Sequence, residues 1–184
     1  DSNSGLNYWE TAGGDDVVYF KGNGWLVTKD GDDIVYMSEG VDISEFYGYE
    51  KNEKIWQKVD VGWGDDKVIA GAGNQYAHGS NGSDYFEMGD GLDIVTGGSD
   101  ADEFVVDLKN EGFDFITDFV NIGDKITVLN DGEAAQQNDW YLSKTYSQDI
   151  ISISPVYNED IAMTQEFYEI RNADSELVAS FGIG

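Results

Sequence analysis

Glycine and aspartate recur every nine residues through two blocks of this chain, and this period constrains the fold more than any other sequence feature. Each unit carries a glycine, an aspartate two positions later, and a hydrophobic residue two positions after that. The glycines of the second block are Gly64, Gly73, Gly82 and Gly91. The acidic positions after them hold Asp66, Gln75, Asp84 and Asp93, and Asp102 continues the series. An earlier block, which contains Asp15 and Asp33, keeps the same period from Gly13 to Gly40.

The unit resembles the nonapeptide G-G-x-G-x-D-x-U-x of the RTX (repeats-in-toxin) family, the calcium-binding, hemolysin-type repeats of secreted proteins. The best single match is Met88 to Thr96, MGDGLDIVT. The resemblance implies an all-β fold, a right-handed parallel β-roll of nonapeptide repeats. Six residues of each unit suit a turn and three suit a short strand, so two units complete a coil of about eighteen residues. Glycine fits these turns because they require positive φ, which a Cβ atom disfavours.

Aspartates that lie one coil apart are expected to form a column along one edge of the roll. Successive strands stack at roughly 4.8 Å, and two unit charges at that distance repel by about 3 to 4 kcal/mol at an effective dielectric constant near 20. Calcium, a hard cation that takes six to eight oxygen ligands, would remove this repulsion. The predicted pairs are Asp66 with Asp84, Asp84 with Asp102, and Asp15 with Asp33. On the opposite edge Gln75 faces Asp93, so a weaker site is expected there.

The predicted calcium site therefore comprises both aspartates and turn glycines: Asp15, Asp33, Asp66, Asp84, Asp93, Asp102, Gly64, Gly82 and Gly91. The alternative is that some of these turns are stabilised only by hydrogen bonds from aspartate to the backbone.

The charge balance excludes some partners. The chain has 37 acidic and 10 basic residues, a net charge of -27, and no cysteine. Nucleic acids and anionic membrane surfaces bind basic footprints, which are missing here. Aromatic residues make up 14% and hydrophobic residues 40% of the chain, so we expect it to fold rather than remain disordered. No apolar run is long enough to span a membrane.

The nine-residue period breaks between the blocks, because Gly40 and Gly64 are not separated by a multiple of nine. We predict a first degenerate repeat block over 1–47, an insertion or irregular coil over 48–61, a second block over 62–106, and a cap with further strands over 107–184, in one domain. The insertion is interpreted as an irregular surface loop. Alternatively, it could carry a polysaccharide site together with turn tryptophans, formed by Lys51, Lys54, Trp56, Trp25 and Trp63.

After Asp102 longer strands replace the short turns. Segments 103–108, 114–119 and 123–129 resemble the segment that closes β-rolls in serralysin-type proteases, which implies a cap over the open end of the repeat stack. Short alternation and aromatic enrichment predict further strands at 140–142, 150–153, 167–170 and 177–181. The segment 176–184 suits either a last strand or an uncleaved signal for type I secretion.

Catalytic motifs are few. His78 is the single histidine and there is no HExxH motif, so a protease zinc site is not expected and we predict that the chain is not an enzyme. The leading hypothesis is a calcium-binding module of a secreted or cell-surface protein that folds on binding calcium outside the cell, in a structural, adhesive or assembly role. One alternative is a polysaccharide-binding module similar to the R-modules of mannuronan epimerases. Another is a subunit that assembles with further copies or with other extracellular proteins.

Overall fold

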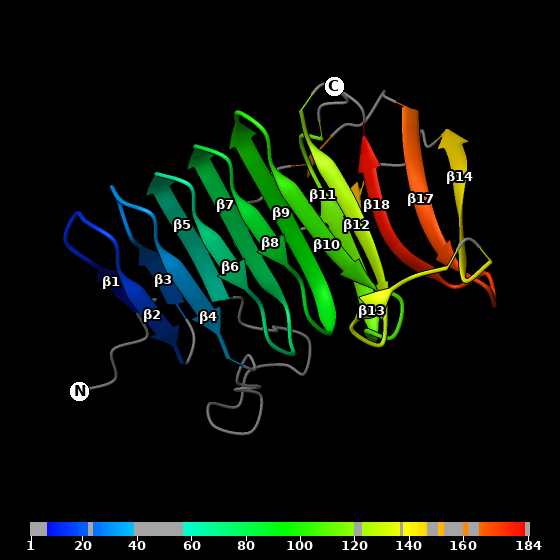
Figure 1. The fold of residues 1–184 in the computed structure, drawn as a ribbon, viewed down its shortest axis with the longest axis horizontal. Coiled ribbons are helices and arrows are strands. Elements are labelled where there is room, and N and C mark those ends of the chain that lie inside the picture. The colour runs from blue at the N-terminus through cyan, green and yellow to red at the C-terminus, as the bar shows by residue number, and fades with distance from the viewer. Residues whose placement is uncertain are drawn as a thin grey trace.

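The protein folds into two stacked sheets joined by turns, as Figure 1 shows for the computed structural model. The structure describes residues 7–21, 24–38, 57–119, 123–136, 138–146, 151–152, 160–161 and 166–182. All regular elements among these residues are β-strands. No helix long and apolar enough to cross a membrane is found in the described part of the chain.

The strands of the nine-stranded sheet are, in spatial order, β1 (Tyr8–Glu10), β3 (Gly24–Val27), β5 (Gln57–Trp63), β7 (Gln75–Asn81), β9 (Gly91–Ser99), β11 (Gly112–Ile116), β18 (Leu177–Gly182), β17 (Glu166–Asn172) and β14 (Trp140–Tyr146). Those of the seven-stranded sheet are β13 (Glu133–Ala134), β12 (Lys125–Asn130), β10 (Glu103–Asp107), β8 (Tyr85–Glu87), β6 (Lys67–Ile69), β4 (Ile34–Met37) and β2 (Val17–Phe20). A separate antiparallel pair consists of β15 (Ile151–Ser152) and β16 (Asp160–Ile161).

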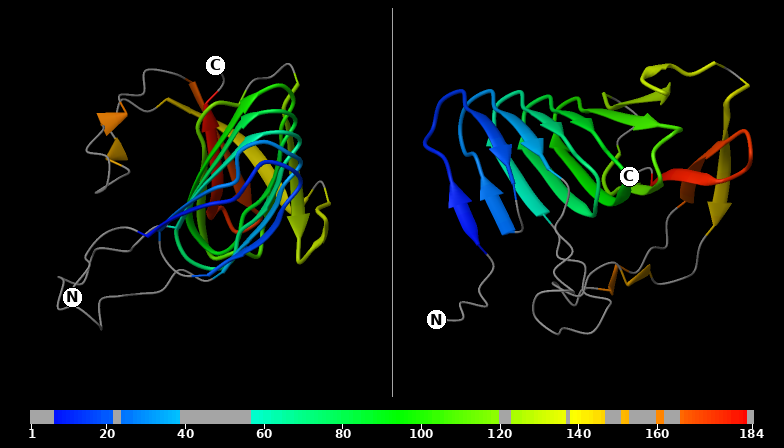
Figure 2. Two further views of the ribbon diagram at one scale, coloured as in Figure 1. Left: turned by 90° about the vertical axis from the view of Figure 1, so that its left-hand side faces the viewer. Right: turned by 90° about the horizontal axis from the view of Figure 1, so that it is seen from below.

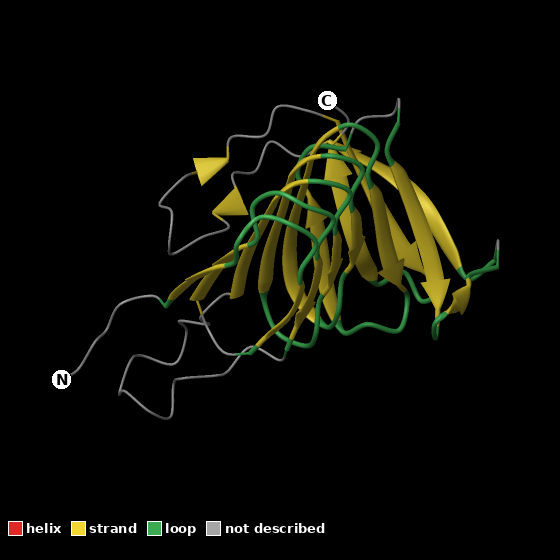
Figure 3. Cartoon of the chain, turned by 60° about the vertical axis from the view of Figure 1, so that its left-hand side comes forward, coloured by secondary structure: helices red, strands yellow, loops and turns green. Residues whose placement is uncertain are grey.

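The chain alternates between the two large sheets from β1 to β12, and each strand pairs in parallel with the strand one coil away. The end-on view in Figure 2 shows these coils lying behind one another as a flattened tube. The predicted all-β parallel roll is therefore confirmed. Figure 3 shows the same arrangement of strands and connecting loops without a helix.

The core consists of inward side chains that occupy the same position in successive coils. Val68, Phe86 and Phe104 stand in register in the seven-stranded sheet, and each is at most 1% exposed. The rings of Phe86 and Phe104 stack with centroids 5.5 Å apart. Because parallel strands in register repeat each position at the strand spacing, one hydrophobic residue per unit is enough to build a continuous core.

The two repeat blocks stack directly on each other. Strand β3 pairs with β5, and β4 pairs with β6, although residues 39–56 between them lie outside the described residues. Strand β5 begins at Gln57, so the last residues of the range predicted as irregular belong to a regular strand.

Antiparallel strands close the far end of the roll. In one sheet β13 folds back on β12, and in the other β18 pairs in parallel with β11 before β17 and β14 continue antiparallel. The strands expected beyond Asp102 are present, and the segment 177–182 forms β18. These elements cover the strand edges that the repeat stack would otherwise expose.

Candidate metal centre

A column of aspartates runs along the edge where the chain enters the seven-stranded sheet. Each member stands immediately before a strand, and the strand register places the members one above another: Asp16, Asp33, Asp66, Asp84, Asp102 and Asp124. In each step, the backbone N–H of one aspartate donates to Oδ1 of the next. The N–H of Asp66 lies 2.8 Å from Oδ1 of Asp84, and that of Asp84 lies 2.9 Å from Oδ1 of Asp102.

The second carboxylate oxygen in the middle of this column has no hydrogen-bond partner. Asp66 and Asp84 are each 2% exposed, and Oδ2 of both is buried without a donor. Buried polar atoms are almost always paired, and an unpaired one costs about 1–3 kcal/mol, more when it is charged. Of all features of the structure, these oxygens therefore favour a cation-binding site most strongly.

A backbone carbonyl lies close to the buried Oδ2 of Asp84. A Cβ atom on Gly79 would collide with both Oδ2 of Asp84 and the carbonyl oxygen of Gly97. One coil further on, a Cβ atom on Gly97 would collide with Oδ2 of Asp102. The carboxylates of Asp84 and Asp102 thus lie close to the glycine backbone of the nine-stranded sheet, and that of Asp84 forms with the Gly97 carbonyl part of the all-oxygen environment that calcium prefers.

Burial dominates the electrostatics of the column. Desolvation, together with the negative charges of neighbouring aspartates and against the effect of the backbone hydrogen bonds, raises the pKa of Asp66 and of Asp84 to about 7. The same causes raise the pKa of Asp102 to about 6. A bound cation would favour the ionised form of all three groups.

A second acidic pair lies on the opposite edge. The N–H of Gln75 donates to Oδ1 of Asp93 at 2.8 Å, as expected from the sequence, but on its other side Asp93 faces Asp114. Both aspartates are buried, and their carboxylates are in contact. Desolvation raises the pKa of Asp93 to about 8 and, with the Asp93 charge, holds that of Asp114 well above its ordinary value. Asp93 therefore has the carboxylate partner that the sequence did not show.

The first coil is one residue shorter than expected, which changes the partner of Asp33. Val17 stands in register with Ile34, so Asp16 rather than Asp15 occupies the column, and its N–H donates to Oδ1 of Asp33 at 2.8 Å. The predicted pairing of Asp15 with Asp33 is corrected accordingly. Asp15 is exposed, and its Oδ1 accepts the N–H of Asp32.

The predicted glycines hold the turns. Gly64, Gly82 and Gly91 have φ of 139°, 120° and 131°, which confirms that these turns need positive φ. A Cβ atom on Gly82 would also collide with the carbonyl of Gly64 in the neighbouring coil. Glycine is therefore required both for the turn conformation and for the close stacking of the coils.

The acidic side chains meet in pairs rather than in larger groups. In the described segments, no three histidine, cysteine, aspartate or glutamate side chains converge on one point that could hold a metal ion. An ion in the main column would therefore take its remaining ligands from turn carbonyls and water, a mixture that is ordinary for calcium.

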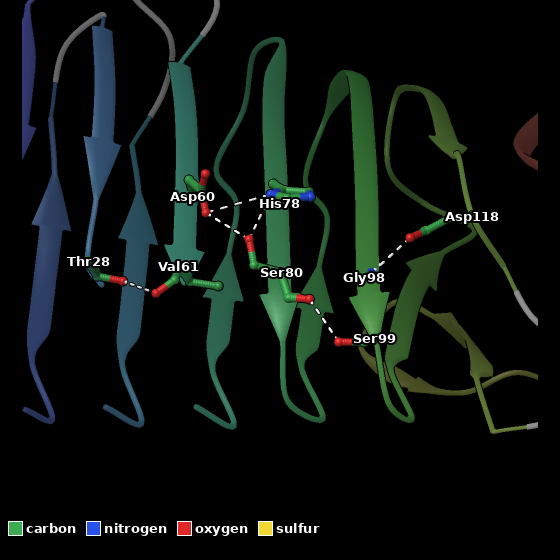
Figure 4. A network of polar contacts seen from close by, with 8 residues as sticks. All are labelled: Thr28, Asp60, Val61, His78, Ser80, Gly98, Ser99 and Asp118. Carbon is green, nitrogen blue, oxygen red and sulfur yellow. Dashed lines mark hydrogen bonds and ion pairs between the residues drawn. The ribbon is translucent and has the colours of Figure 1, made fainter. Parts of the chain in front are cut away.

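His78 belongs to a polar network on the outer face of the nine-stranded sheet, shown in Figure 4. The hydroxyl of Ser80 donates to Oδ1 of Asp60 at 3.0 Å and lies 2.9 Å from Nδ1 of His78. Oδ1 of Asp60 lies 3.6 Å from the same nitrogen. The nearby carboxylate of Asp60 raises the pKa of His78. A catalytic relay needs the carboxylate and the hydroxyl on opposite nitrogens, so these three residues are not arranged as a triad.

Some of the residues predicted to bind polysaccharide lie outside the described residues, and the others lie on different strands. Lys51, Lys54 and Trp56 lie outside the described residues. Trp63 is 67% exposed. Nζ of Lys58 lies over the ring of Trp25, 4.2 Å from its centroid, and covers one face on which a sugar would stack.

A substitution at Gly79 tests whether the carboxylate of Asp84 must lie close to the backbone of Gly79. Gly79→Ala is expected to destabilise the protein by about 2 kcal/mol or more, because the added methyl group would collide with the carboxylate of Asp84 and with the carbonyl of Gly97. Gly13→Ala is the matched control, since its nearest neighbour is Asp30 O at 3.6 Å. Urea denaturation with excess calcium measures the stability of both variants. Equal effects would contradict the close approach of the Asp84 carboxylate to Gly79.

Comparisons of this chain with protein-family models, with curated proteins and with solved structures gave no match. The site is thus defined by its own residues and geometry, and the resemblance to RTX proteins rests on the nine-residue units and on the segments that follow Asp102.

Proposed function

We propose that this chain is a calcium-binding module, of the RTX kind, in a secreted or cell-surface protein. It folds on binding calcium outside the cell and serves a structural, adhesive or assembly role. The observation that supports this most is the pair of buried carboxylate oxygens, Oδ2 of Asp66 and of Asp84, that have no hydrogen-bond donor.

The donor set favours calcium over other cations. The column offers carboxylate and carbonyl oxygens, and the chain contains no cysteine that would favour a softer metal. Calcium accepts irregular coordination by six to eight oxygens, whereas magnesium demands a compact octahedron and retains its waters. Asp33, Asp66, Asp84 and Asp102 would hold the ions in the main column, and Asp93 with Asp114 would hold one on the opposite edge.

Calcium binding would be coupled to folding, because the column exists only when the coils are stacked. A ligand that binds only the folded state stabilises it by about 2.7 kcal/mol per site at a hundredfold excess over Kd. Two or three such sites supply a stability comparable with that of an ordinary domain, roughly 5–15 kcal/mol. With a net charge of -27, the metal-free chain has strong self-repulsion to overcome.

A calcium titration tests the proposal. Chelator-treated protein at pH 8 is expected to show little β structure by far-ultraviolet circular dichroism, and to gain it cooperatively as calcium is added. Magnesium at the same concentrations is the control and should not restore the signal. A β spectrum that chelator leaves unchanged at pH 8 would contradict calcium-dependent folding.

A further inference from the structure

Three side-chain donor atoms converge on the outer face of the nine-stranded sheet, in the polar network of Figure 4. They are Oδ1 of Asp60 in β5, and Nδ1 of His78 and Oγ of Ser80 in β7. Asp60 and His78 stand opposite each other in the strand register, and Ser80 follows His78 by two residues. Because side chains alternate along a strand, all three lie on the same side of the sheet.

The three atoms form a compact triangle. Oγ of Ser80 lies 3.0 Å from Oδ1 of Asp60 and 2.9 Å from Nδ1 of His78, and Oδ1 lies 3.6 Å from Nδ1. A tetrahedral zinc ion with bonds of about 2.0–2.2 Å places its donor atoms about 3.3–3.6 Å apart. The triangle is therefore within a few tenths of an ångström of three corners of such a tetrahedron.

The lone pairs of this triangle outnumber its protons. The distance of 3.6 Å between Asp60 and His78 is too long for a hydrogen bond, so the Ser80 hydroxyl is the only bridge between them. In the neutral tautomer that carries its proton on Nε2, both Nδ1 and Oδ1 are acceptors, and the single hydroxyl proton can serve only one of them. A cation between the three atoms would be bound by all of them at once.

The arrangement that excludes a catalytic relay suits chelation. The oxygens of Asp60 and Ser80 lie on the same side of the imidazole, at Nδ1, and Figure 4 shows the other ring nitrogen of His78 on the far side from both. The side chains of His78 and Asp60 are 34% and 29% exposed, so an ion can enter from the solvent. A water molecule would complete the tetrahedron, as in zinc sites with three protein ligands.

The charges near the triangle favour a cation. The carboxylate of Asp60 and, more weakly, that of Asp118 raise the pKa of His78, so both act on the ring as negative charges. The nearest basic residue along β5 is Lys58, whose Nζ lies over the rings of Trp25 and Tyr76, 4.2 Å and 5.0 Å from their centroids.

The backbone at Ser80 is a second, independent observation. Ser80 has a left-handed φ of 79°, and the residues opposite it on the neighbouring strands are Gly62 and Gly98, with φ of 96° and 111°. Glycine adopts this conformation without strain, whereas serine does not. Serine thus stands where the ladder otherwise has glycine, and its hydroxyl supplies the third corner of the triangle.

We infer that Asp60, His78 and Ser80 form a zinc-binding site on the outer face of the nine-stranded sheet. Imidazole nitrogen is a common ligand of zinc, whereas calcium takes oxygen ligands, so this site differs in chemistry from the aspartate columns. The inference goes beyond the calcium-binding function proposed above and does not depend on it.

The test follows the ring of His78, which is the single histidine of the chain and therefore gives one unambiguous signal. Protein with nitrogen-15 in its histidine is titrated with zinc in excess calcium, so that zinc does not titrate the aspartate columns. A saturable shift at one equivalent of zinc is expected for the Nδ1 resonance, while Nε2 keeps its proton.

Two variants and one control define the ligands. Asp60→Asn removes the charged ligand and should weaken zinc binding at least about tenfold. Ser80→Gly removes the hydroxyl and relieves the left-handed φ, so it should keep or raise the melting temperature while zinc binding weakens. Ser99→Ala is the control, because the Ser99 hydroxyl bonds only to the Ser80 carbonyl and to Asn81 among the described residues, and it should leave zinc affinity unchanged.

Three results would overturn the inference: a His78 spectrum that excess zinc leaves unchanged, coordination through Nε2, or equal zinc affinity in the parent protein and in Asp60→Asn. Calcium-dependent folding is measured by circular dichroism and the zinc site by the His78 resonance. Either proposal can therefore fail while the other stands.

Discussion

Replacing Asp84 with asparagine is expected to shift the stability of the protein in opposite directions with and without calcium. In chelator at pH 8, where the parent protein is expected to be largely unfolded, Asp84→Asn should raise the folded fraction by an amount that corresponds to about 1–3 kcal/mol, because it removes a buried charge whose Oδ2 has no donor. The amide retains an oxygen for the N–H of Asp66 and brings a donor toward the carbonyl of Gly97. With calcium present, the same change removes a charged ligand, and the calcium midpoint should rise at least about tenfold.

Asp65→Asn is the matched control for this experiment. Asp65 precedes Asp66 in the same turn, but it is exposed and its Oδ1 already accepts the N–H of Ser83 at 2.8 Å. Its substitution should leave both the chelator stability and the calcium midpoint close to those of the parent protein. If Asp84→Asn destabilised the protein equally in both conditions, its carboxylate would be only a structural hydrogen-bond acceptor, and the calcium assignment would fail.

The metal-free protein is expected to become more stable as the pH is lowered from 8 to 5. Folding raises the pKa of Asp102 to about 6, of Asp66 and Asp84 to about 7, and of Asp93 to about 8, from an ordinary value of 3.8. For a raised pKa the folded state binds the proton more tightly. The stabilisation is therefore complete below the ordinary value and is lost as the pH rises through 6 to 8.

Circular dichroism at several pH values measures the folded fraction in chelator, which should be small at pH 8 and grow as the pH is lowered, and urea denaturation measures the stability in saturating calcium. In chelator the free energy of unfolding should fall with pH by up to about 1.4 kcal/mol per unit for each carboxyl group that titrates. In saturating calcium the free energy of unfolding should rise with pH or stay constant. The reason is that calcium requires the ionised carboxylates and protons compete with it. A free energy of unfolding that is flat from pH 5 to 8 in chelator would show that the column is not protonated in the metal-free fold.

The nine-residue period was sufficient to predict the roll and the centre of its aspartate column. Asp66, Asp84 and Asp102 lie 18 residues apart, and the structure stacks them as expected. The prediction succeeds there because each unit forms the same turn and strand from its own residues. A glycine that allows positive φ and a hydrophobic residue that faces inward are local requirements, and they repeat wherever the sequence repeats.

The nine-residue period did not predict the residues at the ends of either column, because the coils there differ in length. The N–H of Asp16 donates to an aspartate 17 residues later, and that of Asp102 to an aspartate 22 residues later. The N–H of Asp33 donates to Asp66, which lies 33 residues later. Asp114 stands in register with Asp93 although it follows no nine-residue unit. One local signal would have found Asp16 and Asp124, since every aspartate of the main column immediately precedes a strand of the seven-stranded sheet.

The sequence by itself thus determined the coil, because its turn and strand preferences are set within nine residues. Only the tertiary structure decided which aspartates face each other and which oxygens are buried without a donor. Register between coils is set by backbone pairing across variable numbers of residues, and burial is set by the side chains of neighbouring coils. Oδ2 of Asp84 lies beside Gly79, the first glycine of its own unit, but the carbonyl of Gly97 that lies beside the same position comes from the next coil.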